Sequence, residues 1–113
     1  MAQTASFSSD RTGECTEVLT LDGRCDATTA VEAEHRIRTA LDAGRSEIIF
    51  DLRGVIALSP AMFTMLSRGA IEAKARDGHL RIIRPNVHVW AQFEEHGLGR
   101  VFASFTELSA ALN

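Results

Sequence analysis

The sequence has little of what nucleic-acid-binding and membrane proteins need: it contains one lysine, Lys74, and no long apolar run. The other basic residues are arginines scattered along the chain, and the net charge of −3 argues against binding driven by nucleic-acid phosphates. The apolar runs are far shorter than the ~20 residues of a membrane-spanning helix. Residues 1–10 lack the cationic and apolar segments of a secretion signal. We therefore expect a cytoplasmic protein that neither binds nucleic acid nor inserts into a membrane.

Cysteine is also scarce, and the two thiols are badly placed for a disulfide. Cys15 and Cys25 flank one predicted strand. At about 3.3 Å per residue, this strand holds its ends far beyond the ~7 Å Cα separation that a disulfide permits. We expect two free thiols, whose placement reflects packing or chance.

Residue patterns typical of metal sites and active sites are missing as well. The four histidines are His35, His79, His88 and His96. None lies at i, i+4 from another and no CxxC pair exists, so we expect no metal site. The Gly97-x-Gly99 pair follows a predicted helix, which is the wrong context for a nucleotide loop. With no Ser-His-Asp arrangement visible, we expect a protein that is not an enzyme and uses no cofactor.

The most informative stretch, residues 47–78, predicts a buried strand, a short loop and a long helix. The apolar run 48–50 forms the strand, which we expect to stop at Asp51 and Gly54. Asp51 lies near a strand end, as Asp26 does, and both carboxylates are expected to accept hydrogen bonds from loop N–H groups.

The helix of this stretch carries its own start and stop signals. Ser59 can cap the first free N–H groups, Pro60 suits the first helical position, and Gly78 is placed to end the helix. Its apolar residues recur with helical spacing, which predicts one buried face. These residues are Phe63, Leu66, Ala70 and Ala73.

The remaining elements alternate between strands and helices. We expect further strands at 5–9, 14–21, 80–83 and, briefly, 101–102, and further helices at 28–44, 87–95 and 105–112. Thr28 or Thr29 caps the first of these helices, with Glu32 completing a capping box. Strands alternating with helices indicate a largely parallel sheet.

The length of 113 residues suits a single domain with one modest core. The predicted fold class is α/β, with a mostly parallel or mixed β-sheet of four to five strands and helices packed on it. We expect residues 1–4 to be a flexible N-terminus and residues 5–113 to form the domain.

A resemblance to a known family is carried by three stretches in order: VLTLDGRCDATTAVEAEHRIRTAL, IIFDLRGVIALSPAMFTMLSRGAIEAKARDGHLRIIRP and VWAQFEEHGLGRVF. Together they resemble a STAS domain of the anti-sigma factor antagonist type, over about residues 5–112. The most specific pieces are the turn Gly23–Asp26, the strand Asp51-Leu52-x-Gly54-Val55 and the segment His96-Gly97-Leu98-x-Arg100-Val101-Phe102.

The resemblance implies a protein-binding module of bacterial signalling that regulates transcription. Members of the family bind a partner protein, often an anti-sigma factor with a serine-kinase domain, and this binding frees the sigma factor. The kinase phosphorylates a serine at the start of the central helix, and the added charge and bulk break the complex. The resemblance thus predicts an anti-sigma factor, or a related regulator, as the partner.

The sequence departs from the family at the phosphorylation motif. Where the family has Asp-Ser-Ser-Gly or Asp-Ser-Thr-Gly, this chain has Ser59, Pro60, Ala61 and Met62. The acceptor position falls on Pro60, which cannot carry a phosphate. Ser59 offers a hydroxyl one residue earlier, at a helix N-terminus that favours phosphate, but capping alone explains a serine there. The usual phosphorylation is therefore not expected.

By resemblance, the partner-binding surface lies between Gly54 and Met65. An exposed Met62 would offer an adaptable apolar contact in the first turn of the helix. The expected contact residues are Gly54, Leu58, Ser59, Pro60, Ala61, Met62 and Met65, with Asp26 from the neighbouring turn.

Two alternatives stay open. The chain could instead be a STAS subunit of a transport complex that contacts an ATPase subunit. Exposed sheet edges and an apolar helix start would also permit a homodimer.

Overall fold

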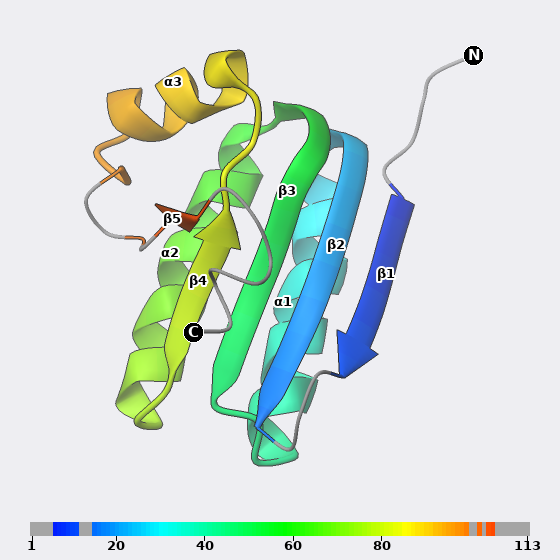
Figure 1. Ribbon diagram of the computed structural model, residues 1–113, viewed down its shortest axis with the longest axis vertical. Coiled ribbons are helices and arrows are strands. Elements are labelled where there is room, and N and C mark those ends of the chain that lie inside the picture. Colours follow the sequence, from blue (N-terminus) through cyan, green and yellow to red (C-terminus); the bar gives the residue numbers. More distant parts are fainter. Residues whose placement is uncertain (1–5, 12–14, 100–101, 103, 106–113) are drawn as a thin grey trace.

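The computed structural model describes residues 6–11, 15–99, 102 and 104–105, which form one sheet with helices on it (Figure 1). The elements are β1 (Ser6–Arg11), β2 (Thr16–Cys25), α1 (Ala27–Asp42), β3 (Glu47–Leu58), α2 (Pro60–Ala75), β4 (His79–Ile83), α3 (Val87–Glu95) and β5 (Ser104–Phe105). Within this described part, the strand order is β1-β2-β3-β4-β5. β1 runs antiparallel to β2, and every other pair of neighbours is parallel.

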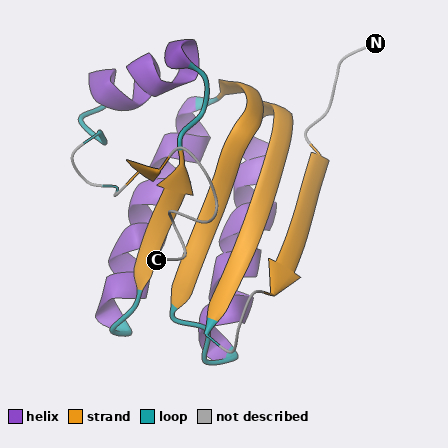
Figure 2. Cartoon of the chain, in the orientation of Figure 1, coloured by secondary structure: helices purple, strands orange, loops and turns teal. Residues whose placement is uncertain are grey.

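The helices divide into a layer and an end piece. α1 and α2 pack side by side on one face of the sheet, whereas α3 lies beyond the carboxyl end of β4 (Figures 1 and 2). The predicted α/β class, with helices packed on a largely parallel sheet, is confirmed. None of the described helices is long and apolar enough to cross a membrane.

The main core lies between this helix layer and the sheet. α1 contributes a stripe of buried residues at helical spacing, Ala30, Ala33, Ile37, Ala40 and Leu41. They meet strand residues such as Leu19, Phe50 and Ile82, which are fully buried. Burying each large side chain of this kind stabilises the fold by about 1.5–3 kcal/mol.

The other face of the sheet carries a smaller core. Val18, Ile49 and Ile83 alternate with the main-core residues along their strands and form a second buried cluster. The central parallel strands are therefore apolar on both faces, which explains why their sequences read as continuous apolar runs.

β3 is longer than predicted, because it continues past Asp51 and Gly54 to Leu58. Asp51 does not break the strand, since its carboxylate, although largely buried, pairs with Arg53. Gly54 lies opposite Asp22 of β2. A Cβ at position 54 would overlap the Asp22 carboxylate, so this glycine permits the close approach of the two strands.

β2 also extends past its predicted end at Leu21, to Cys25. α1 then begins at Ala27, directly after its cap residue. The cap is Asp26 rather than Thr28 or Thr29: its Oδ1 accepts the N–H of Thr29 at 3.1 Å, and the Thr29 hydroxyl accepts the N–H of Asp26 at 3.4 Å. The expected pairing of a threonine with Glu32 is therefore wrong. The expectation that Asp26 satisfies backbone N–H groups is confirmed.

α2 ends at Ala75, and two residues rather than one shape the turn that follows. Asp77 adopts the left-handed conformation, with φ of 61°, that was expected of a terminal glycine. The N–H of Gly78 donates to the carbonyl of Ala73 at 2.7 Å. A Cβ on Gly78 would collide with the backbone of Ser46, so glycine is needed for packing between the two chain segments.

The remaining predictions had mixed outcomes. The helix 87–95 is confirmed at both ends, and the strand at 80–83 is confirmed as β4. The first strand, predicted at 5–9, runs on to Arg11. Phe105, predicted to begin a closing helix, lies in β5, and the rest of that helix falls outside the described residues. Both cysteines are free thiols, Cys15 exposed and Cys25 buried.

Candidate partner-binding surface

The candidate surface lies where β2 and β3 end and α1 and α2 begin. Cys25 and Leu58, the last residues of the two strands, are paired across the ladder. The N–H of Ser59 donates to the carbonyl of Cys25 at 2.9 Å. This bond holds the β2–α1 connection beside the β3–α2 connection. The carboxyl ends of parallel strands share one edge, so Asp26 and Ser59 lie on the same rim.

Ser59 occupies the cap position of α2 but does not cap the helix. Its backbone is extended, with φ of −78° and ψ of 162°, as expected before a proline. Within the described residues its Oγ is buried and has no hydrogen-bond partner. The predicted capping role is therefore wrong, and Pro60 alone provides the start signal. Pro60 itself is exposed.

Three of the expected contact residues are core residues. Met62 is completely buried, and Leu58 and Met65 are buried beside it in the main core. The expectation that Met62 offers an exposed side chain is wrong, because α2 turns this position toward the sheet. Of the first turn, Pro60 and Ala61 remain accessible to a partner.

Asp26 combines an exposed position with a structural role. Hydrogen bonds from the backbone and side chain of Thr29 lower the pKa of its carboxyl. The ionised group balances the N-terminus of α1. Asp26 can therefore contribute a fixed negative charge to the rim without rearranging.

Sequence reasoning missed two exposed apolar residues at this end of the molecule. Ile56 of β3 and Val87 of α3 are 49% and 78% exposed. Asn86, which caps α3, donates from Nδ2 to the carbonyl of Val55 at 3.2 Å and thereby holds the start of α3 against β3. Ile56 could have been found if the strand had been continued past Gly54, because Val55 and Ile56 then fall on opposite faces.

α3 is fastened to α2 by aromatic contacts. The ring centroids of Phe63 and His96 lie 4.2 Å apart in a stacked arrangement, and those of Phe63 and Phe93 lie 5.2 Å apart edge to face. The guanidinium of Arg84 lies 4.5 Å from the centroid of the Trp90 ring, and Trp90 is half-buried against Phe93. The exposed start of α3 therefore stands in a fixed position beside the start of α2.

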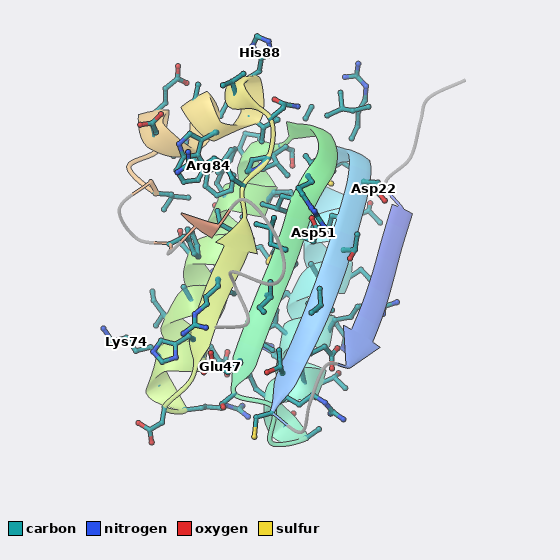
Figure 3. All side chains as sticks on the ribbon, viewed as in Figure 1. Asp22, Glu47, Asp51, Lys74, Arg84 and His88 are labelled. Atoms are coloured by element: carbon teal, nitrogen blue, oxygen red, sulfur yellow. The ribbon has the colours of Figure 1, made fainter. Side chains whose placement is uncertain are left out.

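Charged groups lie around this end of the sheet (Figure 3). Asp51 accepts hydrogen bonds from Arg53 Nη2 at 2.8 Å and Nε at 3.0 Å, and these bonds lower the pKa of Asp51. Asp22 and His88 lie toward the same end, whereas Glu47 and Lys74 lie toward the other (Figure 3). The negative charge of Asp51 is paired with the positive charge of Arg53, as is typical of a structural ion pair.

Burial raises the pKa of the Cys25 thiol to about 11, so this sulfur stays protonated and is a poor nucleophile. In the part of the chain that the structure describes, no three metal-ligating side chains gather. Of the rim side chains at positions 26, 56, 60, 61 and 87, Asp26 is charged and the others are uncharged. Ala61 is half-buried and the other four are exposed.

The fold defines a small α/β domain, and sequence comparison gives its family. The chain belongs to the STAS family, because the family described as "Mlab, STAS domain" matches residues 7–107. No curated protein matches the sequence of this chain.

Solved structures share the fold over nearly the whole chain. The anti-sigma factor antagonist SpoIIAA in its unphosphorylated form is 23% identical, with a TM-score of 0.83 over 93% of this chain and 92% of that one. The phosphorylated form of SpoIIAA, a Bacillus cell fate determinant, is 22% identical, with a TM-score of 0.76 over 93% and 96%. An anti-sigma factor antagonist from Mycobacterium paratuberculosis is 17% identical, with a TM-score of 0.81 over 96% and 91%. At these identities the likeness establishes the fold.

Proposed function

We propose that this chain is a non-enzymatic, cytoplasmic protein-binding module that acts as an anti-sigma factor antagonist-like regulator of bacterial transcription or stress signalling. The observation that carries the proposal is the partly apolar rim formed by the exposed Ile56, Pro60 and Val87 and the half-buried Ala61, beside the charged Asp26. Exposed apolar groups on a rigid support stabilise a complex when a partner buries them. The antagonists named among the structural neighbours support the same class of function.

The proposed partner is an anti-sigma factor with a serine-kinase domain, or a related regulator. The contact would use the accessible part of the predicted surface, namely the exposed Gly54 and Pro60 and the half-buried Ala61, with Asp26 on the rim. The buried Leu58, Met62 and Met65 would support that surface from below. Ser59 would contribute backbone rather than its hydroxyl.

We propose further that phosphorylation at the family position does not switch this contact. Pro60 and Ala61 carry no hydroxyl. The remaining hydroxyl, on Ser59, has its Oγ buried, so a kinase would have to open the start of α2 to reach it. Such a chain would bind its partner constitutively.

The test is affinity purification of tagged protein from its own cells, with the intact mass of the bait measured. Ile56→Glu places a charge on the proposed surface. Ile71→Glu is the matched control, because Ile71 is also exposed (71%) but lies about three helical turns from the start of α2. An anti-sigma kinase that copurifies with wild type and Ile71→Glu, and is lost at least tenfold with Ile56→Glu, supports the proposal. Equal recovery with both variants contradicts it.

A second candidate is a STAS subunit of a transport complex that contacts an ATPase subunit. The Pro60-Ala61 start of α2 favours it, since a permanent subunit needs no phosphorylation switch. Copurification of transporter ATPase subunits, without an anti-sigma factor, would decide for this candidate. A homodimer also stays a prediction, to be checked by light scattering of the purified chain.

A further inference from the structure

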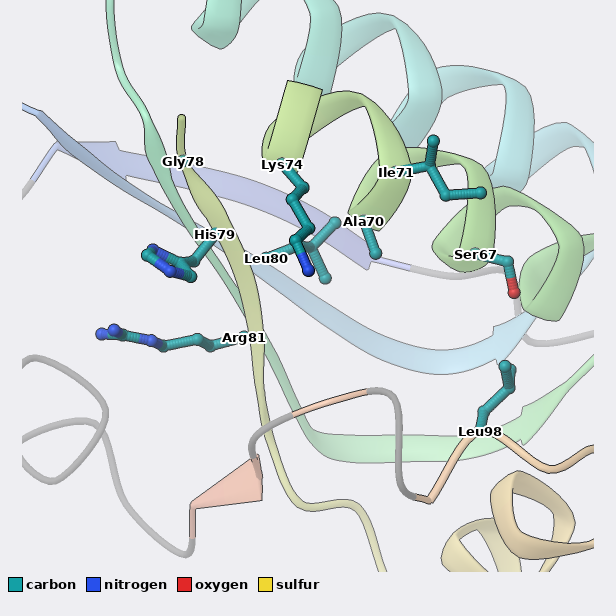
Figure 4. A pocket seen from close by; sticks show the side chains of 9 residues that line it. All are labelled: Ser67, Ala70, Ile71, Lys74, Gly78, His79, Leu80, Arg81 and Leu98. Atoms are coloured by element: carbon teal, nitrogen blue, oxygen red, sulfur yellow. The ribbon is translucent and has the colours of Figure 1, made fainter. Parts of the chain in front are cut away.

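A groove runs between α2 and the outer edge of β4, away from the proposed partner surface (Figure 4). Its volume is about 610 Å³, which lies within the range of about 300–1,000 Å³ typical of small-ligand sites. α2 forms one wall, the first residues of β4 form the other, and Leu98 closes one end.

The floor of the groove is apolar. Leu80 and Leu98 are buried and Ala70 is half-buried, so the floor consists of hydrocarbon side chains that lie mostly below the protein surface. Ile71 stands at the mouth with 71% of its surface exposed. An aliphatic chain that covers this surface would remove apolar area from water, which is the main driving force for such binding.

Basic side chains also line the groove. The Lys74 side chain extends from α2 toward β4, whereas the His79 and Arg81 side chains project from β4 on the side away from α2 (Figure 4). Glu47 offsets the charge of Arg81, since its carboxylate lies 3.5 Å from Arg81 Nη1, and it also lies 3.0 Å from His79 Nδ1. Lys74, the only lysine of the chain, forms no ion pair among the described residues. Its ammonium is therefore placed to receive an anionic head group.

The edge of β4 is too short to add a peptide strand. The N–H of His79 donates to the carbonyl of Ser46, on the β3 side of β4. The backbone N–H and C=O groups of the odd-numbered residues of β4 therefore point toward β3, and those of the even-numbered residues point toward the outer edge. β5 already pairs with Ile82 and Ile83. Among the described outward-facing positions, only Leu80 then presents its N–H and C=O to the groove, which favours a small ligand over a strand.

We propose that this groove binds a small amphiphilic anion, with a carboxylate or phosphate head at Lys74 and an aliphatic chain along Ala70, Leu80 and Leu98. The charge lies at the open side and the apolar floor lies deeper, so one end of such a ligand remains hydrated while the other is buried. The charge of Lys74 and the apolar floor thus favour one class of ligand, bound in a single orientation.

The test is isothermal titration of the whole chain with dodecanoate and with dodecyl phosphate, both kept monomeric. Saturable binding of at least one is expected, and the two ligands distinguish a carboxylate head from a phosphate head. Lys74→Glu should weaken binding roughly tenfold, since it exchanges attraction for repulsion at an exposed site. Ala70→Phe should abolish binding by filling the groove, with thermal unfolding used to show that the variant is folded.

The matched control is Arg68→Glu, which makes the same charge change at an exposed position of α2 outside this groove. It should leave the affinity within about twofold of wild type, and amide NMR shifts on ligand addition should centre on Lys74 and Leu80. The proposal is overturned by any of three results. These are no saturation up to about 1 mM, equal binding of dodecyltrimethylammonium, and equal weakening by Arg68→Glu and Lys74→Glu.

Discussion

At the scale of single residues, Ser59 and Asn86 both occupy the N-cap position, of α2 and α3 respectively, but have different roles. Asn86 accepts the N–H of Val89 at 3.0 Å and donates to Val55, so both ends of its amide are used. The Ser59 hydroxyl is buried with no partner among the described residues. A buried polar group without a hydrogen bond weakens a fold, whereas a bonded cap stabilises it.

Replacing each cap with alanine tests this difference. Asn86→Ala should lower the free energy of unfolding by about 1–2 kcal/mol, because two hydrogen bonds are lost. Ser59→Ala should leave it unchanged or raise it slightly, since no hydrogen bond is lost. Urea denaturation followed by circular dichroism measures both. A loss of about 1 kcal/mol or more in Ser59→Ala would show that Ser59 caps α2 after all.

The Asp51–Arg53 pair predicts a pH dependence of stability. Hydrogen bonds from Arg53 lower the pKa of Asp51 in the folded protein, whereas an unfolded aspartate titrates near pH 3.9. The stabilisation is therefore present above about pH 4 and is lost as the pH falls through the lower, folded pKa. Urea denaturation at about pH 6 and pH 3 should show wild type and Asp51→Asn converging at the lower pH.

Arg53→Gln serves as the control for this pH effect, because it removes the donor and leaves the carboxylate. Its stability should also approach that of wild type at low pH. If either variant kept a constant difference from wild type across this range, the ion pair would not be the cause.

At the scale of elements, the sequence predicted the parts whose signal is local and repeated. The buried stripe of α1 follows from side-chain periodicity, and the helix predicted at 87–95 matches α3 at both ends. The length of β3 could not be predicted in this way. Its continuation depends on Asp22 lying against Gly54, a contact between residues far apart in sequence.

The candidate surface was predictable only in part, for a similar reason. The resemblance located the start of α2, but the rotation of the helix decides that Met62 faces the core and Pro60 faces solvent. Val87 joins this surface through the Asn86–Val55 hydrogen bond, which links segments 31 residues apart. No local pattern encodes such a contact.

The contact between α2 and α3 can be tested at Phe63. This side chain is buried and touches both Phe93 and His96. Phe63→Ala should lower the free energy of unfolding by about 3–5 kcal/mol, through lost burial and the cavity left behind. Hydrogen exchange should accelerate more in α3 than in α1, since α1 keeps its own contacts with β2. Equal acceleration in both helices would mean that Phe63 does not specifically hold α3.

At the scale of the whole molecule, α2 serves two separate surfaces. Its first turn lies on the proposed partner surface, and its later turns line the groove beside β4. The proposed partner site and the proposed ligand site are therefore physically distinct. Loss of one by mutation should leave the other intact, as the variants at Ile56 and Lys74 would show.

The central claim is a protein-binding surface without a phosphorylation switch, and Pro60→Ser tests it most directly. This change restores a hydroxyl at the family acceptor position, where Pro60 is exposed and reachable by a kinase. The measurement is the stability of the complex with the purified partner kinase, with and without Mg-ATP, together with the intact mass of this chain.

The account predicts that the wild-type chain stays unmodified and bound in Mg-ATP, while Pro60→Ser gains one phosphate and dissociates. Pro60→Ala is the control, because it removes the proline without adding an acceptor, and it should behave as wild type does. A wild-type chain that gains a phosphate on Ser59 and leaves its partner would contradict the account.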